Sequence, residues 1–161
     1  DQQRMFAYDF KGYWKDVGTI ESLWEANMDL LTLPMPIDLY DTKWRIYGRN
    51  PGLAPHFIAE GASVRNSLIT EGCEVFGNVD HSVIFSGVTI REGATVKDSV
   101  VMPGAVIERG AQVRRAIISE DAVIGAGATV GEATGNIAVV GTGVRLAAGG
   151  EVKAGEQYAG Q

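Results

Sequence analysis

The sequence contains few of the side chains on which covalent cross-links and metal sites depend. Among its 161 residues there is a single cysteine, Cys73, and there are two histidines, which excludes an internal disulfide and a thiolate zinc cage. Lysine and arginine are outnumbered, 14 against 20 acidic residues, and the net charge of −6 argues against a broad surface for nucleic acid or anionic membranes. No apolar run approaches the ~18 residues of a membrane-spanning helix.

The first residues, Asp1-Gln2-Gln3-Arg4, have neither the basic start nor the apolar core of a signal peptide. We therefore expect a soluble protein of the cytoplasm. The chain begins without Met, in the middle of what reads as structured sequence, so we also expect it to be a piece of a longer polypeptide.

Glycine is the residue in excess, at 21 of 161, nearly twice the usual ~7%. It follows neither the every-third-residue period of collagen nor the polarity of a disordered tract. A chain of this length with 45% hydrophobic residues supports one ordinary core. The composition therefore predicts one domain with many tight turns, together with at most a fragment of another.

An internal repeat indicates the architecture. From residue 84 onward, aliphatic residues recur in triplets, and each triplet is the previous one shifted by 17 positions. The steps of six, six and five residues predict three short strands per coil, separated by corners. The triplets are Ile84, Ile90 and Val96, then Val101, Ile107 and Val113, then Ile118, Ile124 and Val130.

The three hexads that begin at Ile90, Ile107 and Ile124 share an aliphatic first residue, glycine fourth and alanine fifth. The aliphatic side chains can stack one coil above another at the ~4.8 Å spacing of hydrogen-bonded strands. Glycine tolerates a positive φ at a corner, and alanine is small enough to face into a narrow prism. The expected columns are Gly93, Gly110 and Gly127; Ala94, Ala111 and Ala128; and Ser82, Ser99, Ala116 and Ala133.

Two irregularities interrupt the period. Ile69, Val75 and Val79 give steps of six, four and five, which predicts a corner shortened by two residues. A ten-residue gap before Val140 holds residues 132–139, which we interpret as a loop projecting from a corner. Cys73 falls at a small hexad position, so we expect a packed thiol rather than a nucleophile.

The first third of the chain has a different pattern. Residues 19–33 carry apolar side chains at helical spacing, with Thr19 as a cap and Pro34 as a stop. Residues 34–57 read as a proline-rich linker, which we expect to pack on the solenoid through Trp44, Ile46 and Tyr47. The expected units are 1–33, 34–57 and 58–161.

The six-residue spacing resembles the hexapeptide repeat of left-handed parallel β-helices. The expected fold is thus mainly β, a single-stranded left-handed parallel β-helix preceded by one α-helix and a linker. The stretch from Gly12 to Thr19, followed by residues 21–27, looks like the end of a sugar-1-phosphate nucleotidyltransferase domain. This stretch is joined to a hexapeptide β-helix that contains Asn66-Ser67-Leu68-Ile69 and Asp98-Ser99-Val100-Val101-Met102-Pro103-Gly104. The combination resembles the bacterial glucose-1-phosphate adenylyltransferase (ADP-glucose pyrophosphorylase) family.

That resemblance implies a parent enzyme that makes ADP-glucose and pyrophosphate from ATP and glucose 1-phosphate for glycogen synthesis. It implies that Asp16 helps to hold Mg²⁺ and that Trp14 lies beside the glucose site. The family's other catalytic elements precede this stretch, so we expect the 161-residue chain alone to be inactive. The β-helix would serve regulation and assembly, with Arg114, Arg115 and Arg145 as effector-binding candidates.

The resemblance also implies partners, namely the catalytic domain of the same polypeptide and further subunits in a tetramer, homomeric or mixed with a related subunit. We expect neither nucleic acid nor a membrane as a partner. Two alternatives stay open. One is a hexapeptide acyltransferase that uses acyl-coenzyme A, with His81 as its catalytic histidine; the other is an inactive regulatory subunit of the adenylyltransferase.

Other motifs have simpler explanations. His81 belongs to a polar column with Asn66, Asp98 and Arg115, which we interpret as an outward, solvated ladder. The glycine-rich stretches 125–127 and 141–143 lie at or beside hexad corners, and no helical pattern follows to support a phosphate loop. Two histidines are too few for the three-histidine metal site of β-helical carbonic anhydrases.

Overall fold

The computed structural model describes residues 4–48 and 51–160, which form one helix, α1 (Ile20–Asp29), and 18 short strands in three parallel sheets. Sheet A contains β1 (Phe57–Ile58), β4 (Glu74–Val75), β7 (Thr89–Ile90), β10 (Val106–Ile107), β13 (Val123–Ile124) and β16 (Arg145–Leu146). Sheet B contains β2 (Ser63–Arg65), β5 (Asn78–Asp80), β8 (Thr95–Lys97), β11 (Gln112–Arg114), β14 (Thr129–Val130) and β17 (Glu151–Val152). Sheet C contains β3 (Leu68–Ile69), β6 (Val83–Ile84), β9 (Val100–Val101), β12 (Ala116–Ile118), β15 (Ala138–Val140) and β18 (Gln157–Tyr158).

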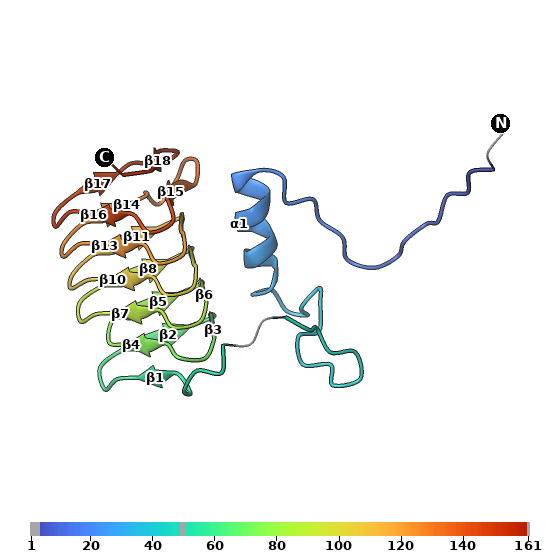
Figure 1. The fold of residues 1–161 in the computed structure, drawn as a ribbon, viewed down its shortest axis with the longest axis horizontal. Coiled ribbons are helices and arrows are strands. Elements are labelled where there is room, and N and C mark those ends of the chain that lie inside the picture. Colours follow the sequence, from blue (N-terminus) through green and yellow to red (C-terminus); the bar gives the residue numbers. More distant parts are fainter. Residues whose placement is uncertain (1–3, 49–50, 161) are drawn as a thin grey trace.

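The chain winds through sheets A, B and C in turn, and each strand pairs with the strand one coil away (Figure 1). Ile107 pairs with Ile90 on one side and with Ile124 on the other, as the 17-residue period predicts. The predicted fold class is therefore confirmed: a hexapeptide-repeat parallel β-helix preceded by one helix and a linker.

The core of the solenoid is the stack of inward aliphatic side chains. Ile90, Ile107 and Ile124 are completely buried, and the alanine column of Ala94 and Ala111 is buried beside them. Burying an isoleucine side chain contributes about 1.5–3 kcal/mol relative to leaving it in water. Because every coil repeats this burial, the stack is the main source of the solenoid's stability.

Two kinds of corner turn the chain. The expected glycine column has positive φ values, 72° at Gly93 and 69° at Gly110. In four successive coils a second corner, between sheets B and C, also has positive φ but is made without glycine. Its members are Asn66 (40°), His81 (46°), Asp98 (48°) and Arg115 (45°). This polar column therefore has a backbone role that a solvated ladder would not require, and asparagine, aspartate and histidine are the side chains that best tolerate this region.

The small column next to that corner is a buried hydrogen-bond ladder. The Ser99 hydroxyl donates to the Lys97 carbonyl at 2.6 Å and accepts from the Ala116 amide at 3.2 Å. The buried Ser99 hydroxyl therefore has a partner both as donor and as acceptor. The predicted fourth member, Ala133, is wrong: Ala116 pairs with Ala138, because the inserted loop shifts the register by five residues.

Both irregularities of the period lie where the steps predict them. The shortened corner brings Val64 against Val79 and contains the buried Gly77, where a Cβ atom would lie 2.4 Å from the Ala94 carbonyl oxygen. The long gap is a loop between β14 and β15, after which Val130 pairs with Val152. Cys73 is buried, and its thiol lies 3.0 Å from the Phe85 carbonyl oxygen, as expected of a packed thiol.

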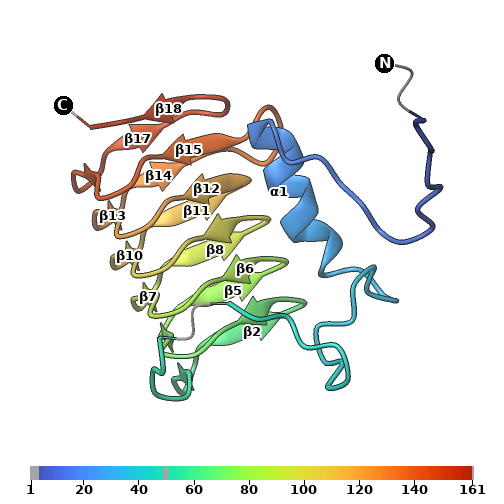
Figure 2. The ribbon, with the colours of Figure 1, turned by 45° about the vertical axis from the view of Figure 1, so that its right-hand side comes forward.

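Helix α1 covers the outer face of sheet C (Figures 1 and 2). Thr19 caps it in a capping box with Ser22. It ends at Asp29, four residues before the predicted end, because the amides of residues 30–32 donate to carbonyls three residues back and tighten the last turn. The solenoid side of this contact consists of Leu68, Val83, Val100, Ile117, Ile137 and Val139.

The linker does not pack as predicted. Trp44, Ile46 and Tyr47 are 84%, 71% and 90% exposed, so the expectation that they cover the solenoid is wrong. Helix α1 already occupies the apolar outer face of sheet C. The linker turns are held locally instead, with the Asp41 carboxylate accepting from the amides of Lys43 and Trp44.

Candidate functional site

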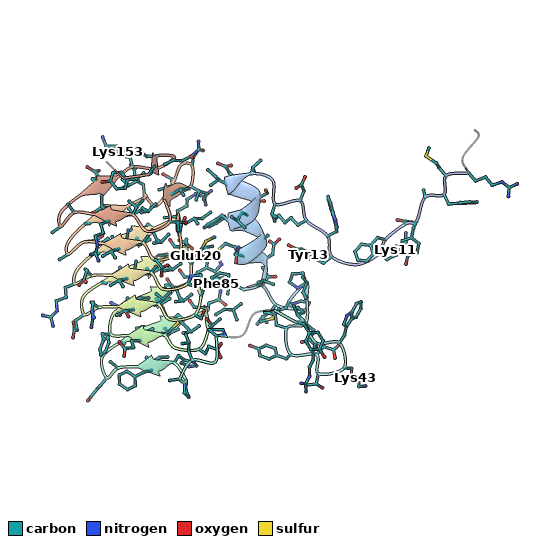
Figure 3. All side chains as sticks on the ribbon, in the orientation of Figure 1. Lys11, Tyr13, Lys43, Phe85, Glu120 and Lys153 are labelled. Atoms are coloured by element: carbon teal, nitrogen blue, oxygen red, sulfur yellow. The ribbon has the colours of Figure 1, made fainter. Side chains whose placement is uncertain are left out.

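The segment before α1 holds both site residues that the resemblance implies in the N-terminal part. From Tyr13 to Asp16 the side chains alternate between half-buried and exposed. Tyr13 and Lys15 lie against α1, as Figure 3 shows for Tyr13, whereas Trp14 and Asp16 are exposed. This alternation is expected of an extended chain, in which successive side chains point to opposite sides.

A cluster of charged and polar groups holds this segment to the helix. The Asp29 Oδ2 atom accepts from the Tyr13 hydroxyl at 2.8 Å and from the Lys15 ammonium at 3.0 Å. The Lys15 Nζ atom also lies 3.1 Å from Glu25 Oε2. We call Tyr13, Lys15, Glu25 and Asp29 the helix clamp.

The geometry of the clamp shifts the pKa values of its members. The hydrogen bond from Lys15 holds the pKa of Asp29 below its ordinary 3.8, and the bond from Tyr13 acts in the same direction. The same contact raises the pKa of Lys15 above 10.5. Burial, followed by the hydrogen bond to Asp29, raises the pKa of Tyr13. All three shifts favour the charged ion pair and the protonated phenol.

Asp16 turns the chain into α1. Its Oδ1 atom accepts from the Gly18 amide at 3.0 Å, just before the Thr19 cap. A carboxylate oxygen is the ligand type that Mg²⁺ prefers, but octahedral Mg²⁺ needs six donors. Within residues 4–48 and 51–160 no group of three or more His, Cys, Asp or Glu side chains could hold a metal ion. Mg²⁺ usually keeps several waters and binds one or two carboxylates together with substrate phosphates, so the Asp16 carboxylate fits as one contributing ligand.

Trp14 is 76% exposed and lies on the side of the segment away from the clamp. An exposed indole offers a flat apolar surface with one hydrogen-bond donor, which suits contact with a sugar ring. Figure 1 shows that the segment preceding it leads away from the solenoid. The solenoid therefore does not cover Trp14.

The three effector candidates lie on different sides of the solenoid. Arg114 ends β11 in sheet B, Arg145 begins β16 in sheet A, and Arg115 lies at the corner between sheets B and C. Arg114 and Arg145 are exposed and have no acidic partner within the described part of the chain. They are the two exposed candidates, whereas Arg115 is half-buried.

Arg115 is engaged in a contact between α1 and the solenoid. Its guanidinium carbon lies 4.7 Å from the centre of the Trp24 ring, and its Nε donates to the Gly135 carbonyl at 2.7 Å. The Trp24 indole donates to the Asp98 carbonyl at 2.8 Å, and His81 Nδ1 lies 2.7 Å from Asp98 Oδ1. His81 is thus part of the corner that receives the helix.

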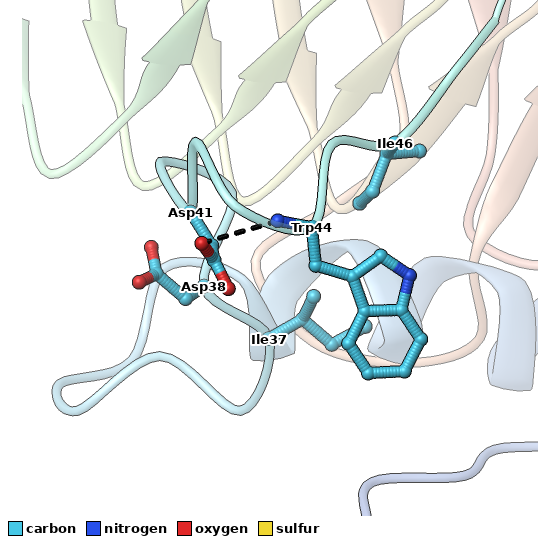
Figure 4. Close-up of a pocket in the computed structure, with 5 residues that line it drawn as sticks. All are labelled: Ile37, Asp38, Asp41, Trp44 and Ile46. Atoms are coloured by element: carbon cyan, nitrogen blue, oxygen red, sulfur yellow. Dashed lines mark hydrogen bonds between the residues drawn. The ribbon is translucent and has the colours of Figure 1, made fainter.

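The linker forms a shallow hollow of its own. It is lined by Ile37, Asp38, Asp41, Trp44 and Ile46, and the Trp44 amide donates to Asp41 Oδ1 across it (Figure 4). Its carboxylates are used in local turns, since Asp38 Oδ1 accepts from the Tyr40 amide at 2.9 Å. The hollow brings together no set of acid, base and nucleophile.

Sequence reasoning missed the clamp and the docking face of sheet C. The face has a clear signal, because sheet C strands carry consecutive aliphatic residues, such as Val100-Val101, which is typical of strands buried on both sides. The clamp has a weaker signal. Asp29 stands at the end of a helix, where a negative charge is unfavourable unless a cation accompanies it.

No helix in the described residues is both long enough and apolar enough to cross a membrane. The comparisons with known proteins divide the chain in the same way as its structure. Residues 1–32 match the family model "Nucleotidyl transferase", and residues 56–152 match "GlmU-like, C-terminal hexapeptide". The linker lies between the two matches.

Similar proteins include three named glucose-1-phosphate adenylyltransferase. That of Desulforamulus reducens is 60% identical over 96 residues, which are 60% of this chain and 24% of the relative. Those of Bacillus subtilis and Bacillus mycoides are 54% and 56% identical over 96 residues, 60% of this chain and 25% and 26% of theirs. The chain thus spans about a quarter of the length of these relatives. Since the hexapeptide model matches more than half of it, the chain belongs to the GlmU-like, C-terminal hexapeptide family.

Proposed function

We propose that this chain is the C-terminal part of a glucose-1-phosphate adenylyltransferase. The parent enzyme would form ADP-glucose and pyrophosphate from ATP and glucose 1-phosphate, for glycogen synthesis in the cytoplasm. In this proposal residues 1–33 complete the nucleotidyltransferase domain, and the β-helix serves regulation and assembly. The 161-residue chain by itself would be inactive, because the resemblance assigns it Asp16 as a metal ligand and places the family's other catalytic elements outside this stretch.

The observation that carries the proposal is the attachment of one unit to the other. The part of the chain that matches nucleotidyl transferases, residues 1–32, includes α1, and α1 packs on a hexapeptide solenoid. The 54–60% identity to adenylyltransferases supports the same conclusion.

The roles of the site residues follow from their chemistry. Asp16 offers a hard oxygen ligand to Mg²⁺, which would neutralise charge on the phosphates of ATP. Trp14 would contact the glucose ring through its exposed indole. Both residues act only when the rest of the nucleotidyltransferase domain supplies the remaining donors and the phosphate-binding groups.

Regulation and assembly use the solenoid surface in this proposal. Arg114 and Arg145 are exposed cations suited to an anionic effector. The strands at the two ends of each sheet, such as β1 and β16, pair on one side only. Such edges require a cover, and further subunits in a homomeric or mixed tetramer would provide it.

The test compares the 161-residue chain with the longer polypeptide that carries it. Both are purified and assayed for ADP-glucose formation from ATP, glucose 1-phosphate and Mg²⁺. The expected result is activity in the longer polypeptide and none in the chain. Absence of activity from the longer polypeptide would overturn the adenylyltransferase assignment, and activity in the chain would overturn its inactivity.

Asp16→Asn in the longer polypeptide tests the metal role. The expected result is a large loss of kcat and a higher Mg²⁺ requirement, with unchanged oligomeric state. Asp9→Asn is the matched control, since within the described residues Asp9 is exposed and its ion pair is with Lys11. Equal activity of the two variants would contradict the role of Asp16.

A further inference from the structure

The segment that carries Trp14 and Asp16 is held in place by side chains rather than by a backbone ladder. Residues 13–17 belong to neither a helix nor a strand. Their direction is determined where Tyr13 and Lys15 contact Asp29. Because neighbouring side chains of an extended chain point to opposite sides, anchoring Tyr13 and Lys15 also orients Trp14 and Asp16.

Lys15 also stabilises α1 itself. Glu25 and Asp29 are four residues apart on α1, so their like charges lie on one face and repel each other. Asp29 is also the last residue of α1, at the negative end of the helix dipole, and α1 has no basic residue in its last turn. The Lys15 ammonium bridges the two carboxylates and offsets both effects.

The opposite face of α1 is attached to the solenoid. Met28 is buried against sheet C, and Trp24 donates its hydrogen bond to the Asp98 carbonyl. The helix therefore has the solenoid on one side and the clamp on the other. Through it, the rigid stack of coils determines where residues 13–16 lie.

We propose that Tyr13, Lys15 and Asp29 are positioning residues, which hold Trp14 and Asp16 outward from α1 as a preformed unit of the adenylyltransferase site. This inference rests on the proposed function. A carboxylate on an anchored segment binds a metal without first losing the conformational freedom of that segment, so the clamp would raise both Mg²⁺ affinity and turnover.

The first test uses the 161-residue chain and needs no activity. ¹⁵N relaxation reports the motion of the Trp14 and Asp16 amides in the wild type, in Asp29→Asn and in Lys15→Met. The expected result is a loss of order at these two amides in both variants, with unchanged solenoid signals. Glu21→Gln is the matched control, because Glu21 lies in the first turn of the same helix and outside the clamp.

The second test measures the same substitutions in the longer polypeptide. Asp29→Asn and Lys15→Met should lower kcat and raise the Mg²⁺ concentration for half-maximal activity, each by about 10- to 100-fold. The KM for glucose 1-phosphate should change less. Lys15→Arg keeps the cation and should restore most of the activity, whereas a role in stability alone would not distinguish arginine from methionine at equal folding.

The two proposals fail in different ways. If the wild-type longer polypeptide makes no ADP-glucose, the proposed function is overturned. If it is active and Asp29→Asn retains either the order of residues 14 and 16 or the wild-type kcat and Mg²⁺ requirement, the positioning role is overturned. If order is lost and kcat falls in both clamp variants but not in Glu21→Gln, the positioning role is supported.

Discussion

The solenoid and the N-terminal third of the chain achieve order by different means. In the solenoid an inward residue such as Ile107 contacts equivalents of itself one coil away, and it is completely buried. In residues 4–48 the buried hydrophobic side chains are Met28 and Leu31, and both lie against sheet C. A repeat builds its own core, whereas the segment before it depends on one docked helix and one clamp.

The largest difference between the regions should come from side-chain truncation. Ile107→Ala removes a buried side chain from the centre of the stack, and we expect the free energy of unfolding to fall by about 3–4 kcal/mol. Ile46→Ala removes a 71% exposed side chain and should change it by less than about 0.5 kcal/mol. Chemical denaturation followed by circular dichroism measures both. Equal midpoints for the two variants would contradict the stacked core.

A pair of glycines sharpens the comparison within the solenoid. Gly131 and Gly127 have φ of 72° and 66°, so alanine is similarly strained at both. At Gly131 the new Cβ would lie 1.9 Å from the Arg114 carbonyl oxygen, whereas at Gly127 it would meet nothing within 4 Å. Gly131→Ala should therefore destabilise by about 1–3 kcal/mol more than Gly127→Ala. A denaturation midpoint that is the same for both variants would mean that the corner at Gly131 is not close-packed.

Disrupting the contact between α1 and the solenoid should have a smaller free-energy cost. Trp24→Phe removes the hydrogen bond to the Asp98 carbonyl and weakens the stacking of Arg115, at a cost of about 1–2 kcal/mol in helix docking. Hydrogen exchange of the α1 amides measures this cost. Trp44→Phe is the matched control, since Trp44 is 84% exposed in the linker and should leave that exchange unchanged.

The smallest effect should be a pH dependence of the clamp. The pKa of Asp29 is lowered in the folded chain, so its contribution is present above 3.8 and is lost as pH falls through the lowered value. The carboxyl signal of Asp29 in NMR should titrate below 3.8 in the wild type. In Lys15→Met the midpoint should move upward. An Asp29 titration midpoint that is the same in Lys15→Met and in the wild type would show that Lys15 does not pair with Asp29.

Much of the solenoid could be predicted because its neighbours stand at a constant offset. The 17-residue period alone is enough to place Ile90, Ile107 and Ile124 in one stack. The same arithmetic fails after residue 130, where the inserted loop changes the offset. It selects Ala133 for the small column, while Ala116 in fact pairs with Ala138.

The candidate site could be predicted only in part. The resemblance identifies Trp14 and Asp16 by their positions in a sequence motif, but it does not indicate which residues hold them in place. Tyr13 and Lys15 belong to the same short stretch but could not be singled out, because their partner is Asp29 on the far end of α1. The prediction for the linker is wrong for a related reason. The hydrophobicity of Trp44 favours burial, but it does not indicate whether an apolar surface of the solenoid is still free to cover the side chain.

The sequence by itself determined the coil, its period, its two irregularities and the start of the helix, because each of these depends on residues at short or regular spacing. Only the tertiary structure decided that α1 lies on sheet C, that the polar corner has a left-handed backbone, and that a clamp orients residues 14 and 16. Contacts such as that between Trp24 and Asp98 join the helix to the 17-residue repeat. No rule of spacing relates such residues, and only the packing of the whole chain brings them together.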